Sequence, residues 1–254
     1  MKIITALISI VLFCIIFFGC RTWQHSNNEV KKYVKKNIST SPFIISDAGH
    51  DGTRKYWQIY FEDKPDYIFR VFSQKSGLFG MPMGYDLTDN FNFMFSYYYL
   101  NEFNQTHTGS LYATTDYDIE GRYTKDGARI FANDIQEYYD YIHSQPYPAK
   151  VKIKCRLVAK NGNELDDFYL FFDKLHMQNN ATLSPFSKLI TEVTEKNIET
   201  ALTQFIETYT KRITDFNHSL PELNEKREGN GLKPLPPKSE NENESWEDYW
   251  NKNR

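Results

Sequence analysis

The segment from Val151 to Ala159 constrains the fold more than any other part of the chain, because its apolar and basic side chains alternate. One face carries Val151, Ile153, Cys155, Leu157 and Ala159, and the other carries mostly Lys152, Lys154, Arg156 and Lys160. A period of two predicts a strand with one buried face. Asn161-Gly162 follows, which is the strongest short signal for a hairpin turn, and Phe168 to Phe172 predicts the returning strand. Cys155 is therefore expected to be a buried core thiol.

A second hairpin is predicted between Tyr56 and Phe72. Its apolar side chains also alternate, with Trp57, Ile59 and Phe61 on the first strand and Tyr67, Phe69 and Val71 on the second. The segment from Glu62 to Asp66 between these strands has the composition of a turn. A short strand at Phe43 to Ile45 and a turn from Ala48 to Gly52 are expected before this hairpin.

Helical periodicity predicts four helices. They are Asn28 to Asn37, Leu87 to Phe103, Asn133 to about His143, and Ser184 to Phe216. The last has Pro185 at its first helical position and would run for about 30 residues, or about 45 Å, which is long enough to brace the whole domain. A further strand is expected from Leu111 to Ile119.

These elements predict an α+β fold in which antiparallel β-hairpins pack against helices. The folded domain would span residues 28–216, and the order helix, hairpin, helix suggests two halves at 28–110 and 111–216. Residues 217–254 contain four prolines and few apolar side chains, so they predict a disordered polar tail. Within it, Lys233 to Pro237 is proline-rich and predicts a stiff polyproline spacer.

Composition and motifs exclude several classes of protein. Lys and Arg number 30 against 33 Asp and Glu, and the net charge of −3 argues against a nucleic-acid partner. Three cysteines are too few for a disulfide scaffold of 254 residues. The sequence contains no P-loop, Gly-x-Ser-x-Gly or dinucleotide motif, so neither a cofactor nor a catalytic set is expected.

The N-terminus predicts export. Met1 and Lys2 precede an apolar run from Ile3 to Phe18, and Gly19 and Cys20 follow before the chain becomes polar. This order predicts a signal peptide at residues 1–19 and a tether at 20–27, although the run is also near the minimum length for an uncleaved membrane anchor. The remaining chain is expected to be tethered to the cell membrane and to face outside the cytoplasm.

Gly19-Cys20 resembles the lipobox of bacterial lipoproteins. The resemblance implies that Cys20 carries a diacylglyceryl group and becomes the first residue of the mature chain. Phe17 and Phe18 differ from the Leu, Val or Ile and the small residue that the motif prefers there. The membrane is therefore one expected partner, through a lipid anchor.

The segment from Phe43 to Thr53 resembles the opening of zinc-dependent N-acetylmuramoyl-alanine amidases, in which a strand leads into Asp-x-Gly-His-Gly-Gly. The resemblance implies that His50 is a zinc ligand, with Asp47 and Gly49 shaping its loop. The glutamate and the second histidine of that family have no counterpart in this sequence, and a catalytic zinc needs three protein ligands. The alternative is a glycine-rich turn in which His50 is solvated.

Two clusters are candidate protein-binding sites. Asp116, Asp118 and Glu120 have the spacing of the start of a calcium loop, but Gly127 occupies the position of its bidentate glutamate. On a strand these carboxylates would share one face, which is either merely solvated or an acidic patch for a basic partner. The second cluster is Trp246, Tyr249 and Trp250 at the end of the tail, which could dock on the body or on a partner.

The stretch from Tyr56 to Tyr99 resembles small uncharacterised lipoproteins of low-GC Gram-positive bacteria. The resemblance is carried by Trp57-x-Ile59-x-Phe61, by Lys64-Pro65-Asp66-x-x-Phe69-x-Val71, and by Leu87-Thr88-Asp89-Asn90-Phe91 before a Tyr-rich segment. It implies a tethered α+β domain without assigned chemistry, and some similar proteins protect their cell against secreted toxins.

The sequence thus favours a membrane-anchored, non-catalytic module that binds an unknown protein, in the manner of toxin immunity. An aromatic-rich sheet face and acidic side chains would hold that partner. Two alternatives remain open at this point. One is a zinc-dependent cell-wall hydrolase centred on His50, and the other is a structural envelope protein whose tail is the working part.

Overall fold

The computed structural model describes residues 25–52, 54–78, 81–107, 109–114, 119–160, 162–180 and 187–238. The chain divides into two compact units, of which the first ends at Phe95 and the second begins at Ser96. Each unit has its own sheet, and both combine strands with helices, which confirms the predicted α+β class. Over these described ranges, no helix combines the length and apolar character that a membrane span requires.

The first unit is built on a four-stranded antiparallel sheet with the order β1-β2-β3-β4. Its strands are β1 (Phe43–Asp51), β2 (Arg54–Phe61), β3 (Lys64–Leu78) and β4 (Met81–Asp89). The predicted hairpin is confirmed, because Ile59 pairs with Phe69 and Trp57 with Val71, and all four side chains are fully buried.

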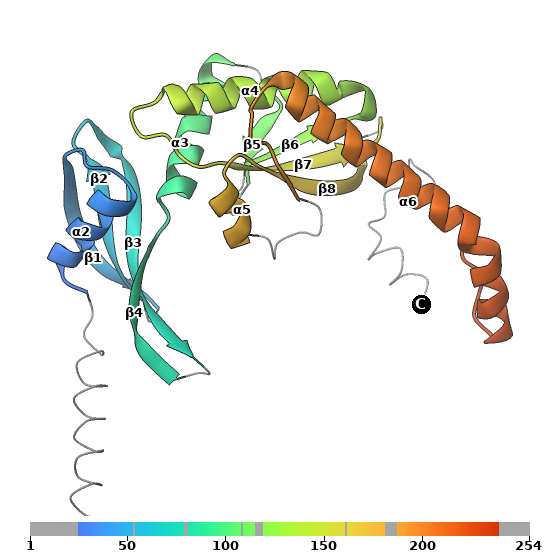
Figure 1. Ribbon diagram of the computed structural model, residues 1–254, viewed down its shortest axis with the longest axis horizontal. Coiled ribbons are helices and arrows are strands. Elements are labelled where there is room, and N and C mark those ends of the chain that lie inside the picture. The colour runs from blue at the N-terminus through green and yellow to red at the C-terminus, as the bar shows by residue number, and fades with distance from the viewer. Residues whose placement is uncertain are drawn as a thin grey trace, which may run out of the picture. The chain divides into compact units, whose positions relative to one another are not determined.

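Helix α2 (Asn27–Asn37) covers one face of this sheet (Figure 1). It begins with a capping box in which Ser26 and Glu29 satisfy each other's backbone N–H groups. Burial of its apolar side chains and two hydrogen bonds fix it to the sheet. The Trp57 indole donates to Asn27 at 2.8 Å, and the Tyr33 hydroxyl donates to Asp89 at 2.6 Å.

Several predictions in this unit are wrong. Strand β3 begins at Lys64, inside the predicted turn, and continues past Phe72 to Leu78, and β4 is not predicted by the sequence. Residues 48–51 continue β1 instead of forming a turn, because Gly49 pairs with Tyr56 across the hairpin. The helix predicted from Leu87 begins at Phe91, since Leu87 lies in β4 and the Asp89 carboxylate caps the Phe91 N–H at 2.9 Å.

Helix α3 (Phe91–Thr106) contributes side chains to both units. In the first unit its initial turns complete an aromatic cluster whose ring centroids lie 4.4 to 6.3 Å apart. The members are Phe61, Phe69, Phe91 and Phe95. In the second unit Phe103 packs on Tyr138 at 5.5 Å.

The second unit contains a five-stranded sheet with the order β5-β6-β7-β8-β9. Its strands are β5 (Leu111–Ala113), β6 (Ile119–Tyr123), β7 (Lys152–Val158), β8 (Glu164–Phe171) and β9 (Ser187–Leu189). The β6–β7 and β8–β9 pairs are parallel, so the sheet is mixed. The sequence predicted neither parallel pair, and it joined β5 and β6 into one strand.

Helices cover one face of this sheet. They are α4 (Ala128–Ser144) and α6 (Glu195–Gly229), which lie side by side over the strands (Figure 1). Two short helices, η1 (Lys125–Gly127) before α4 and α5 (Lys174–Asn180) after β8, complete the unit. The hairpin predicted from Val151 to Phe172 is confirmed, with Cys155 opposite Phe168 and Gly162 at a φ of 87° in its turn. Cys155 is fully buried in the core beneath these helices, as predicted.

The long C-terminal helix exists, but both of its predicted ends are wrong. It begins at Glu195, where the Thr194 side chain caps the Asn197 N–H at 3.2 Å, and residues 187–189 form β9 instead. It ends at Gly229, so residues 217–229 are helical and not part of a disordered tail. Residues 239–254 lie outside the described part of the chain, as do Ser184 and Pro185.

The two predicted halves are not repeats of one structure. The first unit has an all-antiparallel sheet, whereas the second has a mixed sheet whose strands β6 and β7 are joined through α4. The boundary between the compact units also falls at residue 95, not at residue 110.

Candidate functional site

The face of the first sheet that α2 leaves open is the best candidate for a binding surface. Along β2 the side chains alternate, so that Trp57, Ile59 and Phe61 are fully buried while Tyr56, Gln58 and Tyr60 are partly exposed. Ile44 on β1, the register partner of Tyr60 on β2, is 40% exposed. This sheet face therefore presents aromatic and aliphatic surface to solvent.

Four side chains on this face form a continuous row of contacts, which we call the Arg–aromatic ladder. Tyr56 and Phe72 are register partners on β2 and β3, and their ring centroids lie 6.3 Å apart. The Arg70 guanidinium carbon lies 4.4 Å from the Tyr56 ring, and that of Arg54 lies 5.1 Å from the Phe72 ring. Cation–π contacts of this kind are worth about 0.5–1 kcal/mol at exposed positions.

Gly49 on β1 makes room for the Tyr56 ring of the ladder. A Cβ atom at this position would lie 2.6 Å from the Tyr56 hydroxyl oxygen and 2.7 Å from the ring carbon that bears it. Any larger residue would push the ring away from the sheet. The small residue predicted to shape a metal loop therefore makes room for an aromatic ring.

The two arginines of the ladder differ in their partners. Arg54 forms an ion pair with Asp51 at 2.8 Å, and both side chains are about half exposed. In the part of the chain that the structure describes, no carboxylate pairs with the Arg70 guanidinium. The position of this strand segment is fixed by the Arg70 backbone N–H, which donates to the Asn90 side chain at 2.6 Å. Arg70 can therefore offer a pre-positioned guanidinium fork to a carboxylate of a partner.

Glu120 does not lie in the exposed acidic patch that the sequence suggested for it. Glu120 is only 7% exposed, and its carboxylate lies 2.8 Å from Arg156 Nη2 and 3.6 Å from Lys154 Nζ on the neighbouring strand. Lys154 also pairs with Asp167 at 3.0 Å, and Arg156 with Glu164. The basic side chains of β7 thus neutralise Glu120 within the sheet, so it cannot form an exposed acidic patch.

Burial and the neighbouring carboxylates act in opposite directions on the pKa values of the basic groups in this network. Burial alone would lower the pKa of Lys154, but its hydrogen bond to Asp167 and the nearby charge of Glu120 outweigh burial and raise the pKa. The same balance, with Glu164 and Glu120 as partners, raises the pKa of Arg156. These groups therefore remain charged and paired, and they link β6, β7 and β8.

Other predicted site residues are placed as follows. His50 lies exposed on β1, opposite Lys55, and the described ranges contain no group of three or more His, Cys, Asp or Glu side chains arranged to hold a metal ion. The lipid-attachment residue and most of the predicted binding residues lie outside the described residues. These are Cys20, Asp116, Asp118, Trp246, Tyr249 and Trp250.

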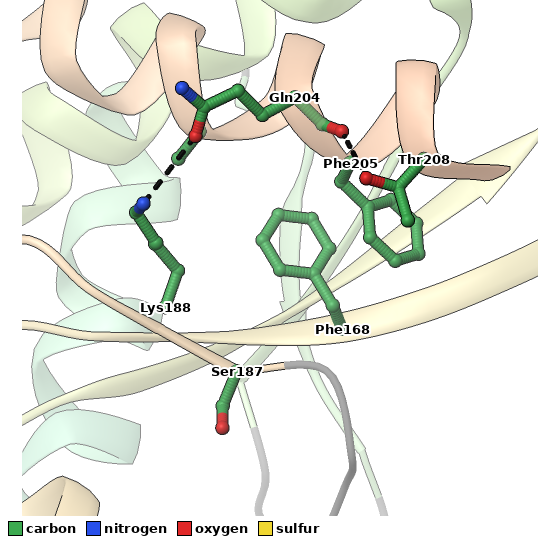
Figure 2. A pocket seen from close by; sticks show the side chains of 7 residues that line it. Phe168, Ser187, Lys188, Gln204, Phe205 and Thr208 are labelled. Atoms are coloured by element: carbon green, nitrogen blue, oxygen red, sulfur yellow. Dashed lines mark hydrogen bonds between the residues drawn. The ribbon is translucent and has the colours of Figure 1, made fainter. Parts of the chain in front are cut away.

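A depression of about 180 Å³ lies in the second unit between α6 and the edge formed by β8 and β9 (Figure 2). Phe168 and Phe205 stack at its base, with centroids 4.4 Å apart, and Lys188 donates to the Gln204 side chain at 3.4 Å at its rim. Lys188 is the one ionisable group in its lining, so the depression offers apolar contact but no acid–base pair.

Cys155 is also unsuited to catalysis. Its thiol is fully buried, and burial raises its pKa well above the usual value, so it stays protonated. Arg54 and Arg70 were not among the site residues predicted from the sequence. The sequence shows that both arginines alternate with buried residues. Their placement over Phe72 and Tyr56, however, depends on the pairing of β2 with β3.

No protein-family model matches the chain. Searches of curated proteins and of solved structures also found no match. A function must therefore be inferred from the residues and their geometry.

Proposed function

We propose that this chain is a non-catalytic binding protein of the cell surface that holds a protein partner on the Arg–aromatic ladder. In this proposal residues 1–19 direct export, and a lipid on Cys20 tethers the chain to the outer face of the membrane. The observation that carries the proposal is the ladder itself, in which Arg70 lies over Tyr56 on an open sheet face without a carboxylate partner among the described residues.

The composition of this surface supports protein binding. Tyr and Arg are enriched among the residues that dominate interface energies, whereas Lys and Glu are depleted there. The ladder also holds its side chains in place before binding, since Tyr56 rests on Gly49 and Arg70 rests on Tyr56. A surface ordered in advance loses less conformational entropy when a partner binds.

The chemistry of the ladder favours one kind of partner. Arg70 would pair with an Asp or Glu carboxylate of the partner, and Ile44 and Tyr60 would pack against apolar side chains around it. We therefore propose a partner surface with an exposed carboxylate inside an apolar patch. A secreted toxin bound in this way would be held at the membrane, in agreement with an immunity-like role.

A site-specific photocrosslinker tests this proposal. Placed at Gln58, next to the ladder, it should crosslink one extracytoplasmic protein in producing cells, and the same probe at the exposed Asp126 of the second unit should not. With the purified partner, Arg70→Ala should weaken binding by about tenfold or more. Arg122→Ala, which removes a half-exposed arginine of the other sheet, should leave the affinity unchanged.

Equal loss of affinity in Arg70→Ala and Arg122→Ala would count against the ladder as the binding site. The tether has a separate test, because Cys20→Ala should abolish incorporation of an alkyne-labelled fatty acid and move the chain out of the lipid-modified fraction. Unchanged labelling of Cys20→Ala would show that the lipid is attached elsewhere.

A further inference from the structure

The chain turns back after α6 and lies along the end of that helix. The Asn224 side chain binds both main-chain groups of Leu235. Its amide N–H₂ donates to the Leu235 carbonyl at 2.9 Å, and its amide oxygen accepts from the Leu235 N–H at 2.7 Å. Asn217 holds Lys238 in the same way, with both distances at 2.8 Å. Arg227 adds a third contact by donating to the Lys233 carbonyl at 2.9 Å.

The spacing of these contacts matches two regular structures. Asn217 and Asn224 are seven residues apart, which corresponds to about 10.5 Å along an α-helix. Leu235 and Lys238 are three residues apart, which corresponds to about 9.3 Å in a polyproline II segment. Two turns of the helix therefore run beside one turn of an extended segment, so that each asparagine reaches an equivalent position of the peptide.

The proline pattern of the segment agrees with this arrangement. In the sequence Pro234-Leu235-Pro236-Pro237-Lys238, only the second and the last residue carry a main-chain N–H, and these are the two that the asparagines bind. Leu235 is 3% exposed and Leu220, between the two asparagines of the helix, is 7% exposed. The helix thus recognises the main chain at two points, and both Leu235 and Lys238, which is 2% exposed, are buried.

We infer that residues 217–227 of α6 form a binding site for an extended proline-rich peptide of a partner protein, with the pattern Leu-Pro-Pro-Lys. The chain's own residues 233–238 occupy this site as an internal ligand. A partner segment of the same pattern binds there by displacing them. This site lies in the second unit and is independent of the Arg–aromatic ladder.

The internal ligand sets the affinity of the site for other peptides. Only residues 230–232 connect it to the helix, and such short connections give effective concentrations in the millimolar range. An external peptide must compete with this concentration, so the site is closed to weak ligands until residues 233–238 are released. Any change that releases the segment should increase the affinity for an external peptide.

The experiment measures binding of a fluorescent peptide with the sequence Lys-Pro-Leu-Pro-Pro-Lys to the full chain by anisotropy. In Leu235→Asp, the charge cannot remain at the buried position, so the internal segment is released. This variant should bind the peptide at least tenfold more tightly than the wild type. A second variant, with residues 233–238 replaced by a Gly-Ser sequence of equal length, should behave in the same way.

The asparagines provide the decisive control. Adding Asn217→Ala and Asn224→Ala to Leu235→Asp should abolish binding, whereas adding Asn197→Ala, at the other end of α6, should leave binding intact. A peptide with Asp in place of Leu should not bind. The inference is overturned if the released variants bind no more tightly than the wild type, if binding persists without both asparagines, or if no variant binds the peptide.

Discussion

Glu120 on β6 accepts a hydrogen bond of 2.8 Å from Arg156 on β7, and less than a fifth of either side chain is exposed. The two strands run parallel, and this pair lies at the centre of a charge network that continues to β8 through Lys154 and Asp167. A carboxylate that the sequence offered as a binding residue is thus a structural part of the sheet.

Removing this carboxylate should destabilise the second unit. Glu120→Ala leaves Lys154 and Arg156 with one acidic partner fewer in a poorly solvated position, and we expect a loss of about 3 kcal/mol in the free energy of unfolding. Urea denaturation measures this change. Glu207→Ala, at an exposed position of α6, should change stability by less than about 0.5 kcal/mol. Similar values for both variants would show that the network contributes nothing to stability.

The stability of the chain should depend on pH through Asp166. Burial raises the pKa of this carboxyl above 3.8 despite its ion pair with Arg212 at 2.8 Å. The folded state therefore binds the proton more strongly than the unfolded state, and this contribution to stability declines as pH rises from the ordinary value through the folded pKa. Asp166→Asn removes that decline.

Consequently, the stability of Asp166→Asn relative to the wild type should increase as pH rises between about 4 and 7. Urea titrations across this range measure the difference. Asp126→Asn is the control, because that carboxylate is 74% exposed, and its stability relative to the wild type should change much less with pH. A relative stability of Asp166→Asn that falls with pH would contradict the assigned direction.

Two glycines at the end of α6 should respond to alanine in opposite ways. Gly231 has a φ of 74° and forms a Schellman motif, with its N–H bonded to Glu228 and that of Leu232 to Arg227. Gly231→Ala should therefore lower the stability of the folded helix end by about 1 kcal/mol. Gly229 lies inside the helix with free space around it. Gly229→Ala should therefore raise the stability of the folded helix end by about 0.5–1 kcal/mol. Hydrogen exchange of the last helical amides measures both, and equal effects would refute the left-handed cap.

The Cys155 thiol should react only when the second unit opens. It is fully buried, and its raised pKa keeps it protonated, so both access and thiolate are lacking in the folded state. In a chain with Cys14→Ser and Cys20→Ser, labelling by a disulfide reagent should be roughly a thousandfold slower in buffer than in denaturing urea. Rapid stoichiometric labelling of the folded chain would place Cys155 outside the core.

The parts of the fold that could be predicted depend on local patterns. Both hairpins were predicted because a period of two is visible in single segments such as Trp57 to Phe61, and because Gly162 allows the turn that follows Ala159. The parallel strands were not predicted, because β9 has only three residues and pairs with β8 through a separate segment of chain. A short strand of this kind has too few residues to show a period.

The prediction ends the long helix at Phe216, because the apolar stripe stops there and residues 217–254 are polar and contain four prolines, one of which, Pro221, lies inside α6. Proline in a helix interior removes the hydrogen bond to the carbonyl four residues earlier, here Asn217. The signals of the true end, Gly231 and Pro234, were present in the sequence. The contacts of Asn217 and Asn224 with residues 235 and 238 support this part of the helix, and such contacts are visible only in three dimensions.

The candidate site shows the same limit. The sequence predicts an aromatic-rich sheet face for binding without assigning residues to it, and the structure places Tyr56 and Phe72, which alternate with buried residues, on the open face. It could not show that Arg70 lies over Tyr56, since that contact depends on the register between β2 and β3. It also could not show that Glu120 meets Arg156, because their strands are separated by α4.

In both sheets the spatial order of the strands is the order in which they occur in the chain. During synthesis or export from the N-terminus, each strand therefore meets its neighbour as soon as the next one emerges, and no strand waits for a distant partner. Helix α6 is the exception, because it covers the apolar side of Phe168 and follows all five strands. A chain that stops before Glu195 would complete its second sheet and leave that side open to water, which makes the last helix the step that protects the nascent protein from aggregation.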